Sequence, residues 1–165
     1  MNKIGVIGLG YVGQTMLGAL ANLGFRVVGM DIDEAKINAM KKGFSPTVYE
    51  PGLKETYLRN KHNIEFTSGY KEIVTECEII VITVGTPWGS DNQPNISGLQ
   101  IVIDSISPSL RKGHLIILRS TVTPGTTVRI GNELSKKSGL LPEKEFYLAF
   151  CPERTIEGIA LHELY

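Results

Sequence analysis

Short apolar runs alternate with amphipathic segments along the whole chain. The runs are rich in Ile and Val and have the length of buried parallel strands; they occupy residues 3–7, 26–30, 64–67, 78–83, 115–118 and 146–150. Between them, apolar residues recur at helical spacing over residues 11–22, 33–42, 53–60, 70–75, 96–110 and 124–137. This alternation predicts an α/β fold, a Rossmann-type doubly wound sheet of six mostly parallel strands with helices on both faces.

Single residues mark several of the predicted helix ends. Gly24 follows the first helix, where a left-handed C-terminal cap is expected. Asp33 can cap the start of the second helix, and Pro124 suits the first turn of the sixth. Residues 161–164 resemble the start of a further helix. Because no linker or repeat divides the chain, we expect a single domain over residues 1–165.

Composition and charge narrow the class of protein. The hydrophobic fraction of 42% argues against disorder. Lys plus Arg and Asp plus Glu each total 17, so the chain lacks the basic surplus that is typical of nucleic-acid binders. Residues 4–23 are largely apolar, but their five glycines suit a strand, a turn and a helix better than a signal peptide or membrane span. We expect a cytoplasmic protein that binds neither nucleic acid nor membranes.

The two cysteines do not indicate a metal or redox site. Cys77 and Cys151 form no C-x-x-C pattern, which removes the usual signal for zinc or a redox pair. Cys77 directly precedes a strand that we expect to be buried, so we interpret it as a packing residue. Cys151 lies close to Glu153, but nothing in its neighbouring sequence suggests an activated thiol.

A glycine motif follows the first predicted strand. Gly8, Gly10 and Gly13 form a G-x-G-x-x-G pattern between a strand and a helix. The first glycine allows the tight turn, the second lets the backbone approach a pyrophosphate, and the third lets the helix pack against the strand. The N-terminus of the helix adds free N–H groups and a partial positive charge. The pattern predicts a dinucleotide site.

Asp31 ends the second strand, about 20 residues after the glycine motif. This is the spacing at which an acidic residue binds the adenosine ribose in dinucleotide-binding folds. A 2′-phosphate would be repelled there, and Asp33 and Glu34 would add to the repulsion. Asp31 therefore favours NAD over NADP. Lys36 either reaches the ribose region or is an ordinary exposed lysine of the second helix, and the sequence leaves both interpretations open.

Polar segments also follow the fourth, fifth and sixth strands. They are residues 84–87, residues 120–126 and residues 151–158. Because the carboxyl ends of parallel strands share one edge of the sheet, these segments are expected beside the glycine motif. A hydroxyl from Thr121 and a carboxylate from Glu153 could there handle a proton or a water molecule. The alternative is that both are ordinary loop residues with satisfied hydrogen bonds.

In this order the motifs resemble those of the nucleotide-sugar 6-dehydrogenases, over the whole chain. The resemblance depends on the glycine motif, Asp31 and residues 50–53, 85–87, 120–122, 124–126, 152–153 and 157–158. It implies that NAD is bound by Gly8, Gly10, Tyr11, Val12, Gly13, Asp31, Lys36, Val84, Gly85, Thr86, Pro87, Thr121 and Glu157. It also implies catalytic roles for Thr121 and Glu153 around a hydrolytic water.

The reaction that this resemblance implies is a four-electron oxidation. The C6 alcohol of a UDP-sugar becomes an aldehyde and then a carboxylate, while two NAD are reduced. The family's nucleophilic cysteine captures the aldehyde, and a thioester is later cleaved by water. We expect that cysteine, a lysine, an asparagine, the dimerisation helix and the sugar-nucleotide domain to lie beyond residue 165. The chain alone should then be inactive, and the complete enzyme a homodimer.

Two positions favour one branch of the family. Arg154, which follows Glu153, and Gly85 resemble the UDP-N-acetyl-D-mannosamine dehydrogenases more than the UDP-glucose 6-dehydrogenases. UDP-glucose remains the alternative substrate. Two other classes of protein stay open: a hydroxyacid-type dehydrogenase with the same glycine motif, and a non-catalytic NAD-binding module.

Overall fold

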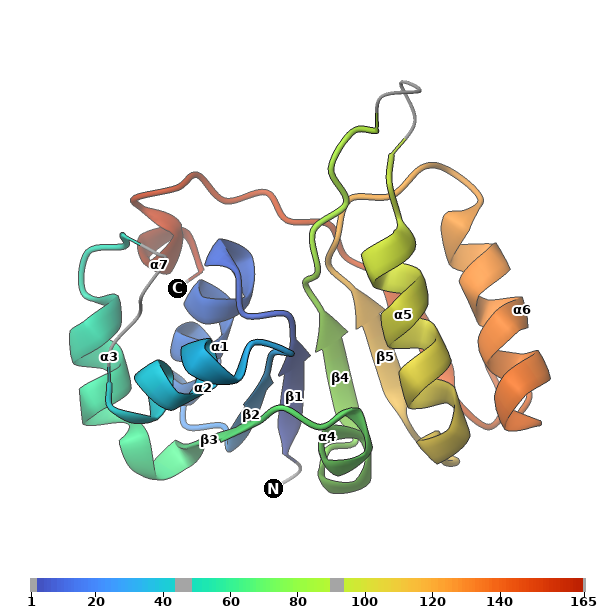
Figure 1. Cartoon of the computed structure of the whole chain (residues 1–165), viewed down its shortest axis with the longest axis horizontal. Coiled ribbons are helices and arrows are strands. Elements are labelled where there is room, and N and C mark those ends of the chain that lie inside the picture. The colour runs from blue at the N-terminus through green and yellow to red at the C-terminus, as the bar shows by residue number, and fades with distance from the viewer. Residues whose placement is uncertain (1–2, 44–48, 90–93, 165) are drawn as a thin grey trace.

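The computed structural model describes residues 3–43, 49–89 and 94–164. Its centre is one parallel sheet of six strands in the order β3-β2-β1-β4-β5-β6 (Figure 1). The strands are β1 (Ile4–Ile7), β2 (Val27–Met30), β3 (Ile64–Thr67), β4 (Ile79–Ile82), β5 (Leu115–Leu118) and β6 (Tyr147–Phe150). The predicted α/β class, strand number and parallel pairing are therefore confirmed, and the strand order is that of a Rossmann fold.

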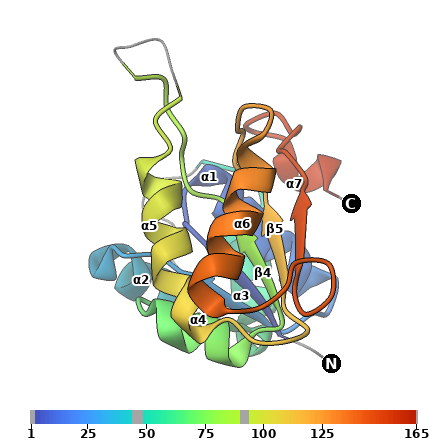
Figure 2. The ribbon, with the colours of Figure 1, turned by 90° about the vertical axis from the view of Figure 1, so that its right-hand side faces the viewer.

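Helices cover both faces of the sheet, as predicted. They are α1 (Tyr11–Asn22), α2 (Glu34–Lys41), α3 (Leu53–Arg59), α4 (Tyr70–Glu76), α5 (Ser97–Ile106), α6 (Thr126–Ser138) and the short α7 (Ala160–Glu163). The described residues also form two 3₁₀ turns: η1 (Lys61–Asn63) lies between α3 and β3, and η2 (Ser107–Ser109) lies between α5 and β5. Figure 2 shows α5 and α6 side by side on one face, while α1 and α3 contact each other on the other.

Alternate residues of the central strands pack in two separate hydrophobic cores, one on each face of the sheet. In β1, Ile7 joins the core under α4, α5 and α6, whereas Ile4 and Val6 join the core under α1 and α3. In β4, Ile82 and Val81 divide in the same way. A strand that is buried on both faces needs apolar residues at every position, which explains the unbroken apolar runs in the sequence.

The helix ends follow the expected residues in part. Asp33 caps α2 by accepting a hydrogen bond from the Lys36 N–H (3.1 Å), and Gly24 has φ +87° just beyond α1. The fifth helix ends at Ile106 rather than at residue 110, because Pro108 lacks the N–H that would continue it. The sixth begins at Thr126, not at Pro124, since the left-handed Gly125 lies between them.

The burial of Cys77 and the length of the helices bear on two points raised by the sequence. Cys77 is completely buried in the first of the two cores, and burial raises the pKa of its thiol to about 12. It is the packing residue that the sequence indicated. Among residues 3–43, 49–89 and 94–164, no helix has both the length and the apolar character needed to cross a membrane.

His114 should make the stability of the fold sensitive to mild acid. It is buried directly before β5, and its Nδ1 accepts the Arg111 N–H at 2.9 Å. Within the described part of the chain, Nε2 has no hydrogen-bond partner. Burial, with the Arg111 charge nearby, lowers the pKa of His114 below its usual 6.5. Below that pH the unfolded chain binds a proton that the folded chain does not.

We therefore expect the free energy of unfolding to fall as the pH decreases from about 6.5, by at most about 1.4 kcal/mol per pH unit from this group. Urea unfolding at pH 7 and pH 5.5 measures the difference, and His114→Gln should reduce it. The exposed His62 provides a matched control, because His62→Gln should leave the pH dependence of the parent chain intact. An unchanged pH dependence in His114→Gln would contradict this assignment.

Candidate nucleotide-binding and active site

The carboxyl ends of the central strands border two adjoining cavities. The larger, of about 360 Å³, extends from the glycine turn to Asp31 and Lys36. The smaller, of about 170 Å³, contains Thr121 and Glu153. The cavities share three wall residues at the end of β4, namely Thr83, Val84 and Gly85. The site is therefore one continuous edge of the sheet, as expected for an open α/β fold.

The glycine turn joins β1 to α1, and its backbone conformation disfavours a side chain at Gly8 and at Gly13. Gly8 has φ +95°, a left-handed conformation. A Cβ atom on Gly13 would lie 2.0 Å from the Gly8 carbonyl oxygen, whereas one on Gly10 would have no atom within 4 Å. The Thr83 hydroxyl donates to the same carbonyl at 2.6 Å and fixes the turn against β4. No side chain caps the N-terminus of α1, which leaves its N–H groups for an anion.

Asp31 is already held by three donors at the end of β2. Its carboxylate accepts the Leu9 N–H (2.8 Å), the Asp33 N–H (3.0 Å) and the Lys36 Nζ (2.8 Å). Burial raises the pKa of Asp31, but the Lys36 and backbone hydrogen bonds outweigh it and lower the pKa below its ordinary value. Asp31 is therefore a carboxylate oriented toward the larger cavity.

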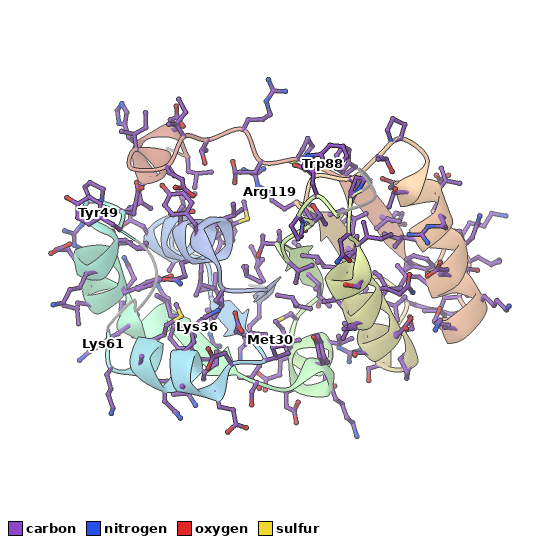
Figure 3. All side chains as sticks on the ribbon, turned by 45° about the horizontal axis from the view of Figure 1, so that its top comes forward. Met30, Lys36, Tyr49, Lys61, Trp88 and Arg119 are labelled. Carbon is purple, nitrogen blue, oxygen red and sulfur yellow. The ribbon has the colours of Figure 1, made fainter. Side chains whose placement is uncertain are left out.

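Lys36 is not an ordinary exposed helix lysine. Its side chain is only 17% exposed, forms an ion pair with Asp31 and lines the larger cavity. Met30 lines the same cavity, and in Figure 3 both residues lie apart from Arg119. Of the two interpretations left open by the sequence, the ordinary exposed lysine is set aside, because Lys36 pairs with Asp31 at the edge of this cavity. An apolar wall of the same cavity is formed by Ile32 and Ile101, both largely exposed.

Hydrogen bonds join the segments that follow β4 and β5. The Ser120 hydroxyl donates to the Val84 carbonyl at 2.6 Å, and the Thr86 hydroxyl donates to the Thr121 carbonyl at 2.6 Å. The Thr121 side chain itself stays exposed. Pro87 lines neither cavity; its carbonyl accepts the Asn95 N–H at 2.7 Å, where the segment projects beyond α5 (Figure 2).

The smaller cavity also contains a cation that the sequence pattern did not single out. Arg119 directly follows β5 and pairs with Glu153, with Nη2 at 3.0 Å from Oε1. Burial raises the pKa of Glu153. The Thr155 and Arg154 N–H groups and the Arg119 charge together outweigh this effect and hold the pKa below its ordinary value. Glu153 is therefore ionised. An arginine at the end of a predicted strand, directly before Ser120, was the available signal.

The segment after β6 crosses the carboxyl edge of the sheet and ends beside α1 (Figure 1). Glu50 holds it there: this buried carboxylate accepts the Gly158 N–H (3.0 Å), the Leu161 N–H (2.9 Å) and the Tyr11 hydroxyl. Burial and the nearby Glu50 raise the pKa of Tyr11 to about 12, so its hydroxyl remains a donor. Tyr11 thus contacts the crossing segment, and Glu157 is exposed beside Gly158.

Glu50 should contribute strongly to stability although it lies outside both cavities. In Glu50→Gln the amide NH₂ group replaces an oxygen that accepts hydrogen bonds, so buried donors lose their partner. We expect the free energy of unfolding to fall by about 1–3 kcal/mol, and residues 151–159 to become more susceptible to limited proteolysis. The exposed Glu55 of α3 gives the control, since Glu55→Gln should change stability by less than about 0.5 kcal/mol. Equal stability of the two variants would contradict this role.

The site residues expected from the sequence divide into three groups. Those of the glycine motif, Asp31, Lys36 and the β4 end line the larger cavity: Gly8, Gly10, Asp31, Lys36, Val84 and Gly85. Those of the smaller cavity are Val12, Thr86, Thr121 and Glu153, together with Val84 and Gly85. The remaining four, Tyr11, Gly13, Pro87 and Glu157, line neither of these two cavities. No group of three or more metal-ligating side chains occurs in the described ranges.

The chain is similar to a known family of enzymes. Residues 2–165 match the family model described as the NAD-binding domain of the UDP-glucose/GDP-mannose dehydrogenase family. The chain is 38% identical over 170 residues to a UDP-N-acetyl-D-mannosamine dehydrogenase of Methanococcus aeolicus, covering 99% of this chain and 36% of that enzyme. It is 32% identical over 165 residues to a UDP-glucose 6-dehydrogenase of Bacillus subtilis, covering 99% and 37%.

A solved structure agrees with these relatives. The crystal structure of a GDP-mannose dehydrogenase from Pseudomonas aeruginosa in a ternary complex superposes with a TM-score of 0.92 and 29% identity, covering 97% of this chain and 38% of that one. The chain thus spans little more than a third of these relatives. The match to the family model sets aside the hydroxyacid-type dehydrogenases. The chain belongs to the UDP-glucose/GDP-mannose dehydrogenase family, and residues 2–165 correspond to its NAD-binding domain.

Proposed function

We propose that this chain supplies the NAD site and part of the catalytic site for oxidising the C6 hydroxyl of a UDP-sugar to a carboxylate. The observation that carries the proposal is that the two cavities adjoin each other and share wall residues. The ribose end, with ionised Asp31, leads through Thr83, Val84 and Gly85 to the pocket that contains Thr121 and Glu153. When bound, NAD would accept hydride at the end nearest that pocket.

The residues of the larger cavity suit a dinucleotide. The uncapped N-terminus of α1 and the open space beside Gly10 can take the pyrophosphate. Asp31, held by Leu9 and Lys36, can accept hydrogen bonds from ribose hydroxyls, and it disfavours a 2′-phosphate. Ile32 and Ile101 offer apolar surfaces to the adenine ring. These features support NAD in preference to NADP.

UDP-N-acetyl-D-mannosamine is the substrate that we propose first. Arg154 and Gly85 support it, as does the relative of Methanococcus aeolicus with that name. UDP-glucose is the alternative, because a Bacillus subtilis relative is named for that substrate. We further propose that Thr121 and Glu153 act around a water molecule in the smaller cavity, and that the complete protein is a homodimer.

The test uses the complete natural polypeptide that contains this chain. With NAD and a limiting amount of UDP-N-acetyl-D-mannosamine, UDP-glucose or GDP-mannose, two NADH should form per molecule of the true substrate. This chain by itself should bind NAD but not turn over. One NADH per sugar would contradict oxidation to the carboxylate. NAD binding without reduction with any sugar nucleotide would favour a non-catalytic NAD-binding module.

A further inference from the structure

Arg119 and Glu153 form the charged pair that lines the smaller cavity. The guanidinium contacts both carboxylate oxygens, with Nη2 at 3.0 Å from each and Nε at 3.1 Å from Oε2. Their side chains are only 11% and 14% exposed. A two-pronged contact of this kind fixes the plane of the carboxylate as well as its charge.

The backbone around the pair limits its movement further. Glu153 Oε1 also accepts the Arg154 N–H (2.7 Å) and the Thr155 N–H (2.8 Å). The Glu153 N–H donates in turn to the Arg119 carbonyl at 3.3 Å. Oε2 therefore receives hydrogen bonds from Arg119 alone, within the described residues, and is the oxygen with room for another donor such as water.

The other charged and titratable groups near Glu153 come from two segments. Arg119 lies at the end of β5, and its Nη1 also contacts the Cys151 sulfur at 3.4 Å. Cys151, Arg154 and Glu157 belong to the same segment as Glu153, and all three are exposed. Within the described ranges, Arg119 is the cation that forms an ion pair with Glu153, and it acts on this carboxylate together with the Arg154 and Thr155 N–H groups.

We propose that Arg119 is a positioning residue that holds Glu153 as an oriented carboxylate facing the smaller cavity, where it receives a proton from water. This inference depends on the function proposed above. In this step a water molecule attacks the acyl carbon of the cysteine thioester. The new C–O bond forms, the C–S bond breaks to release the cysteine thiolate, and one water proton passes to Glu153 Oε2. Arg119 is thereby assigned to the hydrolytic half of the reaction, not to NAD binding.

The first experiment needs no turnover. In this chain with ¹³C-labelled glutamate, the Glu153 carboxyl resonance should titrate below the range of ordinary glutamates. Arg119→Met should raise its midpoint by about one pH unit or more, and Arg119→Lys should raise it less. Arg129→Met is the matched control, because Arg129 pairs with Glu133 on α6 and should leave the Glu153 midpoint unchanged.

The second experiment measures the steps separately in the complete polypeptide. Arg119→Lys should leave NAD affinity and the NADH burst close to those of the parent. It should slow release of the uronate about 10- to 100-fold, and shift the acid limb of that step to higher pH. Arg119→Lys keeps the charge, so it tests the proposal even if Arg119→Met fails to fold.

The two proposals can fail separately. A Glu153 midpoint equal to the parent value in both Arg119 variants would overturn the role of Arg119, whatever the enzyme does. So would normal uronate release, with an unshifted pH profile, in an enzyme whose parent forms two NADH. If the parent reduces no NAD, the proposed function fails, whereas the ¹³C titration still reports whether Arg119 controls Glu153.

Discussion

Replacing Gly13 with alanine should reduce both the stability of the domain and its affinity for NAD. The added Cβ would lie 2.0 Å from the Gly8 carbonyl oxygen and 2.7 Å from the Thr83 hydroxyl. The first contact is with backbone, so no side-chain rotation relieves it, and the turn or α1 must move. We expect the free energy of unfolding to fall by about 1–3 kcal/mol. NAD affinity should fall about 100-fold, or about 2.7 kcal/mol.

Gly10 provides the matched control within the same turn. A Cβ there meets no atom within 4 Å, and its backbone is extended, so Gly10→Ala should change stability by less than about 0.5 kcal/mol. It should still weaken NAD binding, because the open space beside Gly10 is where we place the pyrophosphate. Urea unfolding and calorimetry together measure both quantities. Equal effects of the two alanines on stability would contradict this account of the turn.

Asp31→Asn should weaken NAD binding about 10- to 100-fold and reduce the preference for NAD over NADP. The amide cannot keep all three hydrogen bonds, from Leu9, Asp33 and Lys36. The variant also loses the charge that would repel a 2′-phosphate, so Lys36 becomes an unpaired cation that can attract one. A tenfold change in affinity corresponds to about 1.4 kcal/mol.

Asp33→Asn is the appropriate comparison, because it makes the same chemical change two residues away. Asparagine caps a helix about as well as aspartate, so α2 should be unaffected. Asp33 caps α2 through the Lys36 N–H and does not line the larger cavity. Its substitution should leave NAD affinity near that of the parent, and it should raise NADP affinity less than Asp31→Asn does. A larger loss in Asp33→Asn than in Asp31→Asn would place the ribose site elsewhere.

Local patterns in the sequence predicted most of the fold. Strands buried on both faces leave apolar runs such as residues 79–82, and caps such as Asp33 act within a few residues of their own position. Each of these signals can therefore be recognised in the sequence without knowledge of the tertiary contacts. The predicted helix bounds near Pro108 and Gly125 were less accurate. A proline or glycine indicates that a helix is interrupted, but it does not indicate on which side of that residue the helix lies.

The supporting contacts of the site could not be predicted in the same way. Arg119 and Glu153 lie 34 positions apart, and Glu50 and Leu161 lie 111 apart. The first pair forms because the sheet brings the ends of β5 and β6 to one edge, and the second because the segment after β6 crosses that edge to α7. Glu50 was part of the family resemblance, but its partners Tyr11 and Gly158 follow only from the fold. The side chains expected to contact NAD were easier to locate than those that hold them in place.

The most direct test of the central claim is a calorimetric titration of this chain with NAD and then with NADP. The glycine turn, the free N-terminus of α1 and ionised Asp31 predict saturable binding of one NAD, with NADP binding at least about tenfold more weakly. Binding of NADP as tight as that of NAD would contradict the assignment of Asp31 to the ribose.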